Sequence, residues 1–175
     1  LYLGYEQLEQ LVNTCSIDRG LDIGTPDSEL NSTNFLSHII SRRPCYLFNH
    51  ANIGLQVPYS NPKELALFEK LYFDICRLGE FNADFTKAEP LLRNADIISI
   101  DFQSVKAADL NHANANPNGF RADQICQLAK WLKGKMTTGK LSNGKLPTVN
   151  CRLKSEMELW ICEHCTSGQS CSFEF

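Results

Sequence analysis

No apolar run in this 175-residue sequence approaches the roughly 18 residues that a membrane-spanning helix needs. The first residues, LYLGYEQLEQ, have neither the basic start nor the uninterrupted apolar core of a signal peptide, and they do not begin with Met. Basic residues are not in excess, since 17 Lys and Arg stand against 20 Asp and Glu, for a net charge of -3. We therefore expect no nucleic-acid partner, no membrane partner and a cytoplasmic location.

Cysteine, by contrast, is plentiful, and the eight residues fall into two groups. Free cysteine packs in apolar stretches as a small hydrophobic side chain, and this is the setting of Cys15, Cys45, Cys76 and Cys126. The other four crowd into the last 25 residues, at Cys151, Cys162, Cys165 and Cys171. Without a secretory signal, this distribution indicates reduced thiols rather than a disulfide framework.

Helix-like and strand-like segments alternate along the first three quarters of the chain. The composition, 43% hydrophobic and 21% charged, is that of a folded domain. Apolar periodicity predicts helices over residues 2–12, 35–40, 88–93 and 121–133. Aromatic and β-branched runs predict strands over residues 14–18, 46–55 and 96–101. Such alternation predicts an α/β fold with a parallel sheet covered on both faces.

One further helix has the strongest local signal in the sequence. Asn61 can cap a helix whose first turn holds Pro62 and Glu64, which is a capping-box arrangement. The spacing then predicts one apolar stripe, made of Leu65, Phe68, Leu71, Tyr72 and Ile75. We expect this helix to end at Gly79.

Acidic residues stand at the ends of two predicted strands. Asp18 and Asp22 follow the first strand, and Asp101 ends a nearly continuous apolar strand of the buried, parallel type. Ligands of parallel α/β sheets gather at the carboxyl ends of strands, so these acids are expected to converge on one rim. Two plainer interpretations stay open: acids after strands are often turn residues, and Arg19 beside Asp18 would form a salt bridge where a metal would otherwise sit.

Several longer segments resemble the arginase (ureohydrolase) family, in a bacterial branch described as formimidoylglutamase-like. These segments are FLSHII, YLFNHANIGLQ, NPKELALFEKLYFDICRLGEF, AEPLLRNADIISIDF and NPNGFRADQICQLAKW. SIDRGLDIG resembles the family motif Asp-Ala-His-x-Asp, and SIDFQSV resembles Ser-x-Asp-x-Asp. The resemblance covers about residues 1–131 and implies a three-layer αβα fold with a mostly parallel sheet, here truncated.

The resemblance also implies a chemistry. In the family two Mn²⁺ ions activate a bridging water, which attacks the carbon of a guanidine or linear amidine and breaks a C–N bond. By position, Asp18 and Asp101 would bridge both ions and Asp22 would complete the first ion's ligands. The implied partners are a small amidine or guanidine substrate and further copies of the full-length parent. Asn116 and Asn118 fall in a loop that borders the family's substrate pocket, although turn chemistry also explains them.

Two positions depart from the family pattern. Gly20 stands where the first motif has His, and Gln103 stands where the second has its last Asp. Both losses fall on the second ion. A Gly-Gly-Asp-His-like motif and the family's C-terminal strand with a substrate-side Glu are also absent from the sequence. We therefore expect an internal fragment with impaired Mn²⁺ binding and assign no catalytic residue. It is either a weakened hydrolase or, alternatively, a catalytically silent binding or regulatory protein of this fold.

The last part of the chain changes character. We predict a partial arginase-like α/β domain over residues 1–133 and a diverged, irregular, Cys-rich tail over residues 134–175. The two-residue gap between Cys162 and Cys165 suits tetrahedral Zn²⁺. Cys151 and Cys171 provide no second gap of this kind, so we expect no zinc site in the tail.

Overall fold

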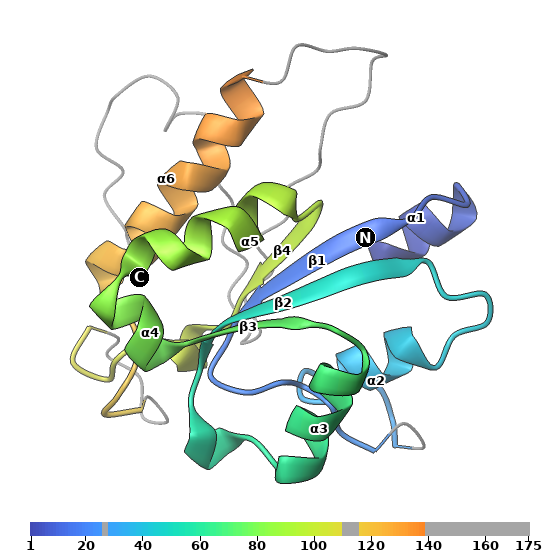
Figure 1. Ribbon diagram of the computed structural model, residues 1–175, viewed down its shortest axis with the longest axis horizontal. Helices are drawn as coiled ribbons and strands as arrows, with labels where there is room; N and C mark the ends of the chain where they lie inside the picture. The colour runs from blue at the N-terminus through green and yellow to red at the C-terminus, as the bar shows by residue number, and fades with distance from the viewer. Residues whose placement is uncertain (26–27, 110–115, 139–175) are drawn as a thin grey trace.

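The computed structural model describes residues 1–25, 28–109 and 116–138 of the chain. In this part, four parallel strands form one sheet in the order β3-β2-β1-β4. The strands are β1 (Val12–Ile17), β2 (Leu47–Leu55), β3 (Asp74–Arg77) and β4 (Ile97–Ile100). The chain steps outward from β1 to β3 and then returns to place β4 on the other side of β1 (Figure 1). The strand order therefore reverses between β1 and β4, and such a switch point is where parallel α/β sheets bind ligands.

Helices cover both faces of the sheet, which gives three layers (Figure 1). One face carries α2 (Phe35–Ile40) and α3 (Pro62–Lys70), and the other carries α4 (Leu78–Ala83), α5 (Ala88–Asn94) and α6 (Ala122–Thr138). The first face buries a cluster made of Leu21, Leu36, Leu55 and Phe68. The second buries a larger cluster that includes Ile17, Ile53, Phe81, Leu92, Phe120 and Leu128. The predicted three-layer α/β fold with a parallel sheet is confirmed.

The predicted capping box is present at the start of α3. Asn61 Oδ1 accepts a hydrogen bond from the Lys63 backbone N–H at 3.0 Å, and the Glu64 carboxylate accepts one from the Asn61 N–H at 3.1 Å. These bonds satisfy backbone donors that have no partner within the helix. The predicted start of this helix is therefore confirmed. The structure also confirms the two predicted helices that correspond to α2 and α5.

The same helix ends earlier than the apolar stripe predicted. α3 stops at Lys70, while Ile75 lies in β3 and Gly79 lies inside α4. Tyr72 has a φ of 57° and is 90% exposed, so it belongs to no buried helical face. The prediction was wrong here because pairing of β3 with β2 overrides local periodicity, and a four-residue strand shows too little alternation to be recognised.

The predicted N-terminal helix is also too long. The observed α1 covers Tyr2–Gln7, and Val12 begins β1, where it is fully buried. Leu8 and Leu11 are exposed instead of packing against the core. The helical prediction failed at this end because Val12 pairs with Leu47 of β2, so sheet formation decides the conformation of this segment.

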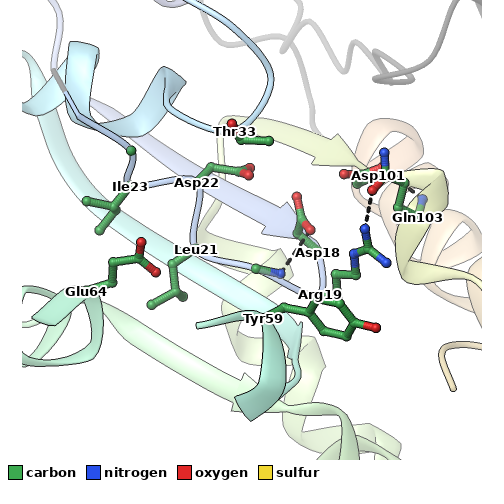
Figure 2. Close-up of a pocket in the computed structure, with 12 residues that line it drawn as sticks. Asp18, Arg19, Leu21, Asp22, Ile23, Thr33, Tyr59, Glu64, Asp101 and Gln103 are labelled. Carbon is green, nitrogen blue, oxygen red and sulfur yellow. Dashed lines mark hydrogen bonds between the residues drawn. The ribbon is translucent and has the colours of Figure 1, made fainter. Parts of the chain in front are cut away.

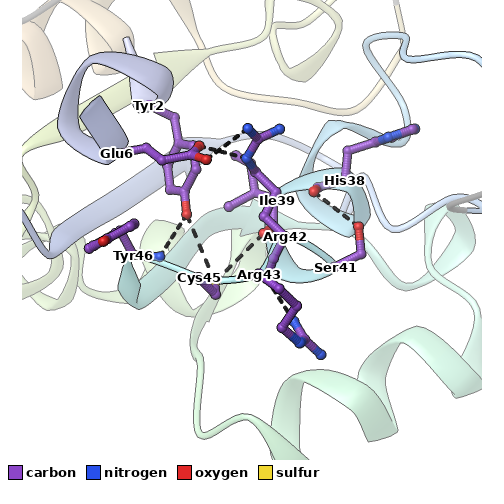
Figure 3. Close-up of polar contacts among 9 residues, drawn as sticks. All are labelled: Tyr2, Glu6, His38, Ile39, Ser41, Arg42, Arg43, Cys45 and Tyr46. Atoms are coloured by element: carbon purple, nitrogen blue, oxygen red, sulfur yellow. Dashed lines mark hydrogen bonds and ion pairs between the residues drawn. The ribbon is translucent and has the colours of Figure 1, made fainter. Parts of the chain in front are cut away.

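The side chain of Tyr2 attaches α1 to the segment that leads into β2 (Figure 3). Its hydroxyl accepts a hydrogen bond from the Tyr46 backbone N–H at 2.9 Å and lies 3.9 Å from Cys45 Sγ. Burial raises the pKa of the Tyr2 phenol above its usual value. Beside it, Arg42 donates to both carboxylate oxygens of Glu6 at 2.6 and 2.8 Å. That ion pair is exposed, so the buried tyrosine is the stronger attachment.

Replacing Tyr2 by Phe is expected to lower the free energy of unfolding by about 1 kcal/mol, because the Tyr46 N–H loses its acceptor. Urea denaturation followed by circular dichroism measures the change. Tyr72→Phe is the matched control: its ring is 90% exposed, and we expect a change of less than about 0.5 kcal/mol. Equal stabilities of the two variants would show that the Tyr2 hydroxyl does not hold α1.

The described cysteines are free thiols, but only two of them lie in the core. Cys15 and Cys76 are buried, and burial raises the pKa of both thiols. Cys45 is half-buried and Cys126 is exposed, so the prediction of core packing is wrong for these two. Cys126 lies on the exposed face of the amphipathic helix α6. The residues next to it in the sequence do not show which way its side chain points.

Helix α6 continues to Thr138, past the predicted boundary at residue 133. The rest of the predicted Cys-rich tail, including Cys162 and Cys165, lies outside the described residues. In the ranges that the structure describes, no helix combines the length and the apolar character that crossing a membrane requires.

Candidate functional site

Asp18 and Asp101 lie side by side at the switch point of the sheet. Each follows its strand directly, β1 and β4, and the preceding residues Ile17 and Ile100 pair in register. The Asp101 N–H continues this pairing by donating to the Ile17 carbonyl at 2.9 Å. Both acids are buried, with 3% of Asp18 and 9% of Asp101 exposed. The expected convergence on one rim is therefore present, while a role as metal ligands stays a prediction.

A pocket of about 350 Å³ opens at this rim (Figure 2). Its walls come from the loop after β1, the short 3₁₀ helices η1 (Val57–Tyr59) and η3 (Phe102–Ser104), and the first turn of α3. The five positions of the two motifs all line it: Asp18, Gly20, Asp22, Asp101 and Gln103. The structure thus brings the five positions that match the family's metal ligands in these motifs into one cavity.

Local turns orient the two central carboxylates. Asp18 Oδ1 accepts a hydrogen bond from the Gly20 backbone N–H at 3.1 Å. Asp101 Oδ1 accepts one from the Gln103 backbone N–H at 2.9 Å and so caps η3. Because each side chain bonds its own backbone two residues on, the turns that follow β1 and β4 set the directions in which the carboxylates point.

Asp22 sits on the same wall with a strained backbone. Its φ of 52° lies in the left-handed region, which costs a residue other than glycine about 1 kcal/mol. The surrounding structure stabilises this conformation, since the Asp22 carbonyl accepts a hydrogen bond from the N–H of buried Leu36 at 3.3 Å. Strain of this kind clusters at functional sites, which supports the pocket as one.

The side chain of Arg19 extends from the loop after β1 toward Gln103, which follows β4 (Figure 2). Its central carbon lies 4.3 Å from the centroid of the Tyr59 ring, a cation–π distance. Its Nη2 donates a hydrogen bond to Gln103 Oε1. A salt bridge between Arg19 and Asp18 was one interpretation left open by the sequence; the hydrogen bond shown in Figure 2 for the guanidinium goes to the amide of Gln103.

The charged side chains of the described pocket wall are acidic apart from this arginine. Among the described residues that line it, Asp18, Asp22, Glu64 and Asp101 are acidic, and Arg19 is the basic one. Two of the four acids are buried, where charge interacts more strongly than in water. The wall therefore favours positively charged groups.

The residues of the pocket do not fit a pair of manganese ions. Within the part of the chain that the structure describes, no group of three or more His, Cys, Asp or Glu side chains is placed to hold a metal. Gly20 has no side chain to offer, and the oxygen of Gln103 already accepts from Arg19. The guanidinium of Arg19 also repels a second cation at this place.

The two asparagines predicted to touch substrate lie nearby but not on the pocket wall. Asn118 is paired with Gln56: its carbonyl accepts from Gln56 Nε2 at 3.2 Å, and its Nδ2 donates to Gln56 Oε1 at 3.3 Å. Asn116 is buried beside it. Neither belongs to the described lining of the pocket, and their predicted role in substrate binding stays a prediction.

Sequence reasoning missed three contributors to the site. Tyr59 lies in η1 just after β2, so the rule that ligands gather at strand ends would have found it if applied to β2 as well. Glu64 was interpreted as a helix cap alone, although it also lines the pocket. Asn52 lies on β2 and is 1% exposed. Its Nδ2 donates a hydrogen bond to the Gly20 carbonyl at 2.7 Å and so stabilises the loop after β1.

No family model and no curated protein sequence matches the chain significantly. Solved structures do match. Formimidoylglutamase from Bacillus subtilis is 13% identical at a TM-score of 0.60, over 72% of this chain and 42% of that one. Formiminoglutamase from Trypanosoma cruzi, determined with Mn²⁺, is 14% identical at a TM-score of 0.59, over 67% of this chain and 42% of that one. Arginase from Medicago truncatula is 16% identical at a TM-score of 0.52, over 72% and 41%.

The chain thus spans well under half the length of the solved structures it matches. At such low identity the likeness speaks to architecture alone, and it agrees with the parallel sheet and the two helical layers. This chain has the arginase-like (ureohydrolase) α/β fold.

Proposed function

We propose that this chain is a ureohydrolase-fold protein that binds a small amidine-type or guanidine-type ligand in its pocket without two-metal hydrolysis. The observation that carries the proposal is the position of Arg19, whose guanidinium lies against Tyr59 and Gln103. By resemblance, Gln103 marks the place of a ligand of the second ion. A positive charge supplied by the chain itself therefore stands where the family would place a metal.

The size and charge of the pocket support a small cationic ligand. Its volume of about 350 Å³ lies at the lower end of the range for small-molecule sites. Four acidic side chains and one arginine line the described wall, so a cation is attracted and an anion is repelled. The structural neighbours named formimidoylglutamase and arginase suggest that the cation is an amidine or a guanidine.

The second candidate function is hydrolysis of C–N bonds with Mn²⁺. It is favoured by the adjacency of Asp18 and Asp101, which resemblance assigns as bridging ligands. In this case residues beyond the described ones would supply the ligands that Gly20 and Gln103 do not. That the sequence is a piece of a longer, oligomeric, cytoplasmic parent is part of the same proposal.

Calorimetry and an activity assay separate the two functions. Formimidoylglutamate, arginine and agmatine are titrated into the protein, with and without Mn²⁺, and product formation is followed in parallel. We expect saturable binding of at least one compound with a Kd below about 1 mM, no heat of Mn²⁺ binding and no turnover. Asp101→Asn, which removes one acid from the wall, is expected to weaken that binding.

Turnover that requires Mn²⁺ would establish the hydrolase instead. If none of the three compounds binds and none is hydrolysed, the pocket has another ligand and both functions are wrong.

A further inference from the structure

We infer that Tyr59, Gln103 and the neighbouring acids form a guanidinium-recognition subsite that the chain's own Arg19 occupies, so that a ligand must displace Arg19 to bind. The inference rests on the proposed function and deepens it. It names the group that is recognised and the side chain that controls access.

The chemistry of the subsite matches a guanidinium in particular. A guanidinium is planar and weakly hydrated, and it combines stacking on an aromatic face with hydrogen bonds in its own plane. Tyr59 provides the face, 4.3 Å from the guanidinium carbon, and Gln103 Oε1 provides an acceptor. Asp18 and Asp101 line the same cavity and supply negative charge. A compact ammonium group would use the charge but not the flat face.

The walls of the subsite are fixed by the backbone. Tyr59 follows β2 in η1, and its N–H donates to the Gln56 carbonyl at 2.9 Å. Gln103 follows β4 in η3, and its N–H donates to Asp101 at 2.9 Å. The main chain of Arg19 is held as well, because its carbonyl accepts from the Gln56 N–H at 2.9 Å. The side chain of Arg19 can therefore move without breaking these main-chain hydrogen bonds.

Arg19 is well placed to leave the subsite. Arg19 is half-buried, and Tyr59, the residue on which its guanidinium packs, is 43% exposed. An aromatic face that is partly open to solvent can exchange one guanidinium for another without unfolding the pocket. The apparent affinity for a ligand then equals the intrinsic affinity multiplied by the fraction of molecules in which Arg19 has moved out.

Removing the internal guanidinium should therefore raise affinity for an external one. We expect Arg19→Ala to bind methylguanidinium at least about tenfold more tightly than the unaltered chain, measured by calorimetry at constant ionic strength. Methylammonium, which has the charge without the planar group, and urea, which is planar without the charge, should show no such gain. Arg42→Ala is the matched control, because Arg42 pairs with Glu6 on α1 outside the pocket.

A second pair of variants tests the walls. In the Arg19→Ala background, Tyr59→Ala should abolish the gain in methylguanidinium affinity, because it removes the stacking face. Equal affinity of Arg19→Ala and the unaltered chain would overturn the inference. So would an equal gain for methylammonium, which would indicate simple relief of charge repulsion.

The unaltered chain offers a readout that does not depend on a variant's folding. Methylguanidinium should shift the NMR signal of the Arg19 Nε–H while the Arg42 signal stays unmoved. Ligand binding that leaves the Arg19 signal unchanged would overturn the self-occupied subsite and leave the proposed function standing. No binding to the unaltered chain or to Arg19→Ala would contradict both.

Discussion

Replacing Gly54 by Ala is expected to lower the free energy of unfolding by about 3 kcal/mol or more. Gly54 lies in β2 with a φ of 102°, a backbone conformation that side chains rarely tolerate. A Cβ at this position would lie 2.5 Å from Phe120 Cζ and closer still to Cε2. Phe120 cannot withdraw, because it is fully buried and stacks edgewise on Phe81 at 5.0 Å between ring centroids. The backbone strain and the steric overlap with Phe120 therefore both destabilise the Gly54→Ala variant.

The same substitution should also disturb the pocket. The added Cβ would contact the backbone carbonyl of Asp18 at 3.4 Å, just where β1 ends. Any shift of β2 away from Phe120 would therefore also displace the turn at Asp18. Loss of ligand binding should therefore accompany the loss of stability in Gly54→Ala.

Urea denaturation measures the effect, and Gly79→Ala is its control. Gly79 lies in α4 with no atom within 4 Å of an added Cβ and no positive φ. Alanine there is expected to leave stability unchanged or to raise it by up to about 1 kcal/mol, because alanine favours helix. If Gly54→Ala were as stable as Gly79→Ala, the packing of Phe120 against β2 would be wrong.

The second large effect is a gain of metal binding. The triple variant Arg19→Ala, Gly20→His and Gln103→Asp is expected to bind Mn²⁺ at least about tenfold more tightly than the unaltered chain, which is about 1.4 kcal/mol. The substitutions restore the motif Asp-Ala-His-x-Asp and the last acid of the second motif. Together with Asp18 and Asp101, they supply the four ligands that the resemblance assigns to the second ion.

The structure indicates that the pocket can accept these changes. Among the described residues, a Cβ at Gly20 would meet the Tyr59 carbonyl alone, at the ordinary contact distance of 3.5 Å, and Gly20 has no positive φ. Removing Arg19 takes a positive charge away from the place that the ion would occupy, and it removes the partner that holds Gln103. Carboxylate and imidazole groups are suitable ligands for Mn²⁺.

Calorimetric titration with Mn²⁺ tests the gain. Adding Asp101→Asn to the triple variant should remove it, because the variant then lacks a carboxylate that the resemblance assigns as a bridging ligand. The double variant Gly20→His, Gln103→Asp, which retains Arg19, should bind more weakly than the triple variant, because the new acid would pair with the guanidinium. Equal Mn²⁺ affinity of the triple variant and the unaltered chain would show that the rim does not have the geometry of a metal site.

Much of the fold could be predicted from local signals. The capping box at Asn61 placed the start of α3, and the apolar run before Asp101 identified β4 as a buried strand. These signals work because each depends on residues within a turn or two of one another. Where a longer-range interaction competed, prediction failed: pairing in the sheet took Val12 and Ile75 out of their expected helices.

The candidate site was predictable in part for the same reason. Asp18, Asp22 and Asp101 were found because acids at strand ends are visible in the sequence, and the parallel sheet then brings them to one rim. Tyr59 was not found, because the same rule was applied to acidic residues alone and not to the aromatic residue that follows β2. The contact of Arg19 with Gln103 was not predicted either, because Gln103 is brought to it only by the pairing of β1 with β4.

The sequence by itself determined the class of fold and the residue types at the rim, including the absence of a side chain at Gly20 and of a carboxylate at Gln103. Only the tertiary structure decided what lies at this place: the guanidinium of Arg19, in contact with an aromatic ring and an amide from two other segments. The physical reason is that composition and periodicity report local preference. Arg19 contacts Tyr59 and Gln103, which are 40 and 84 positions away in the sequence. These contacts form only once the strands have been placed in their order.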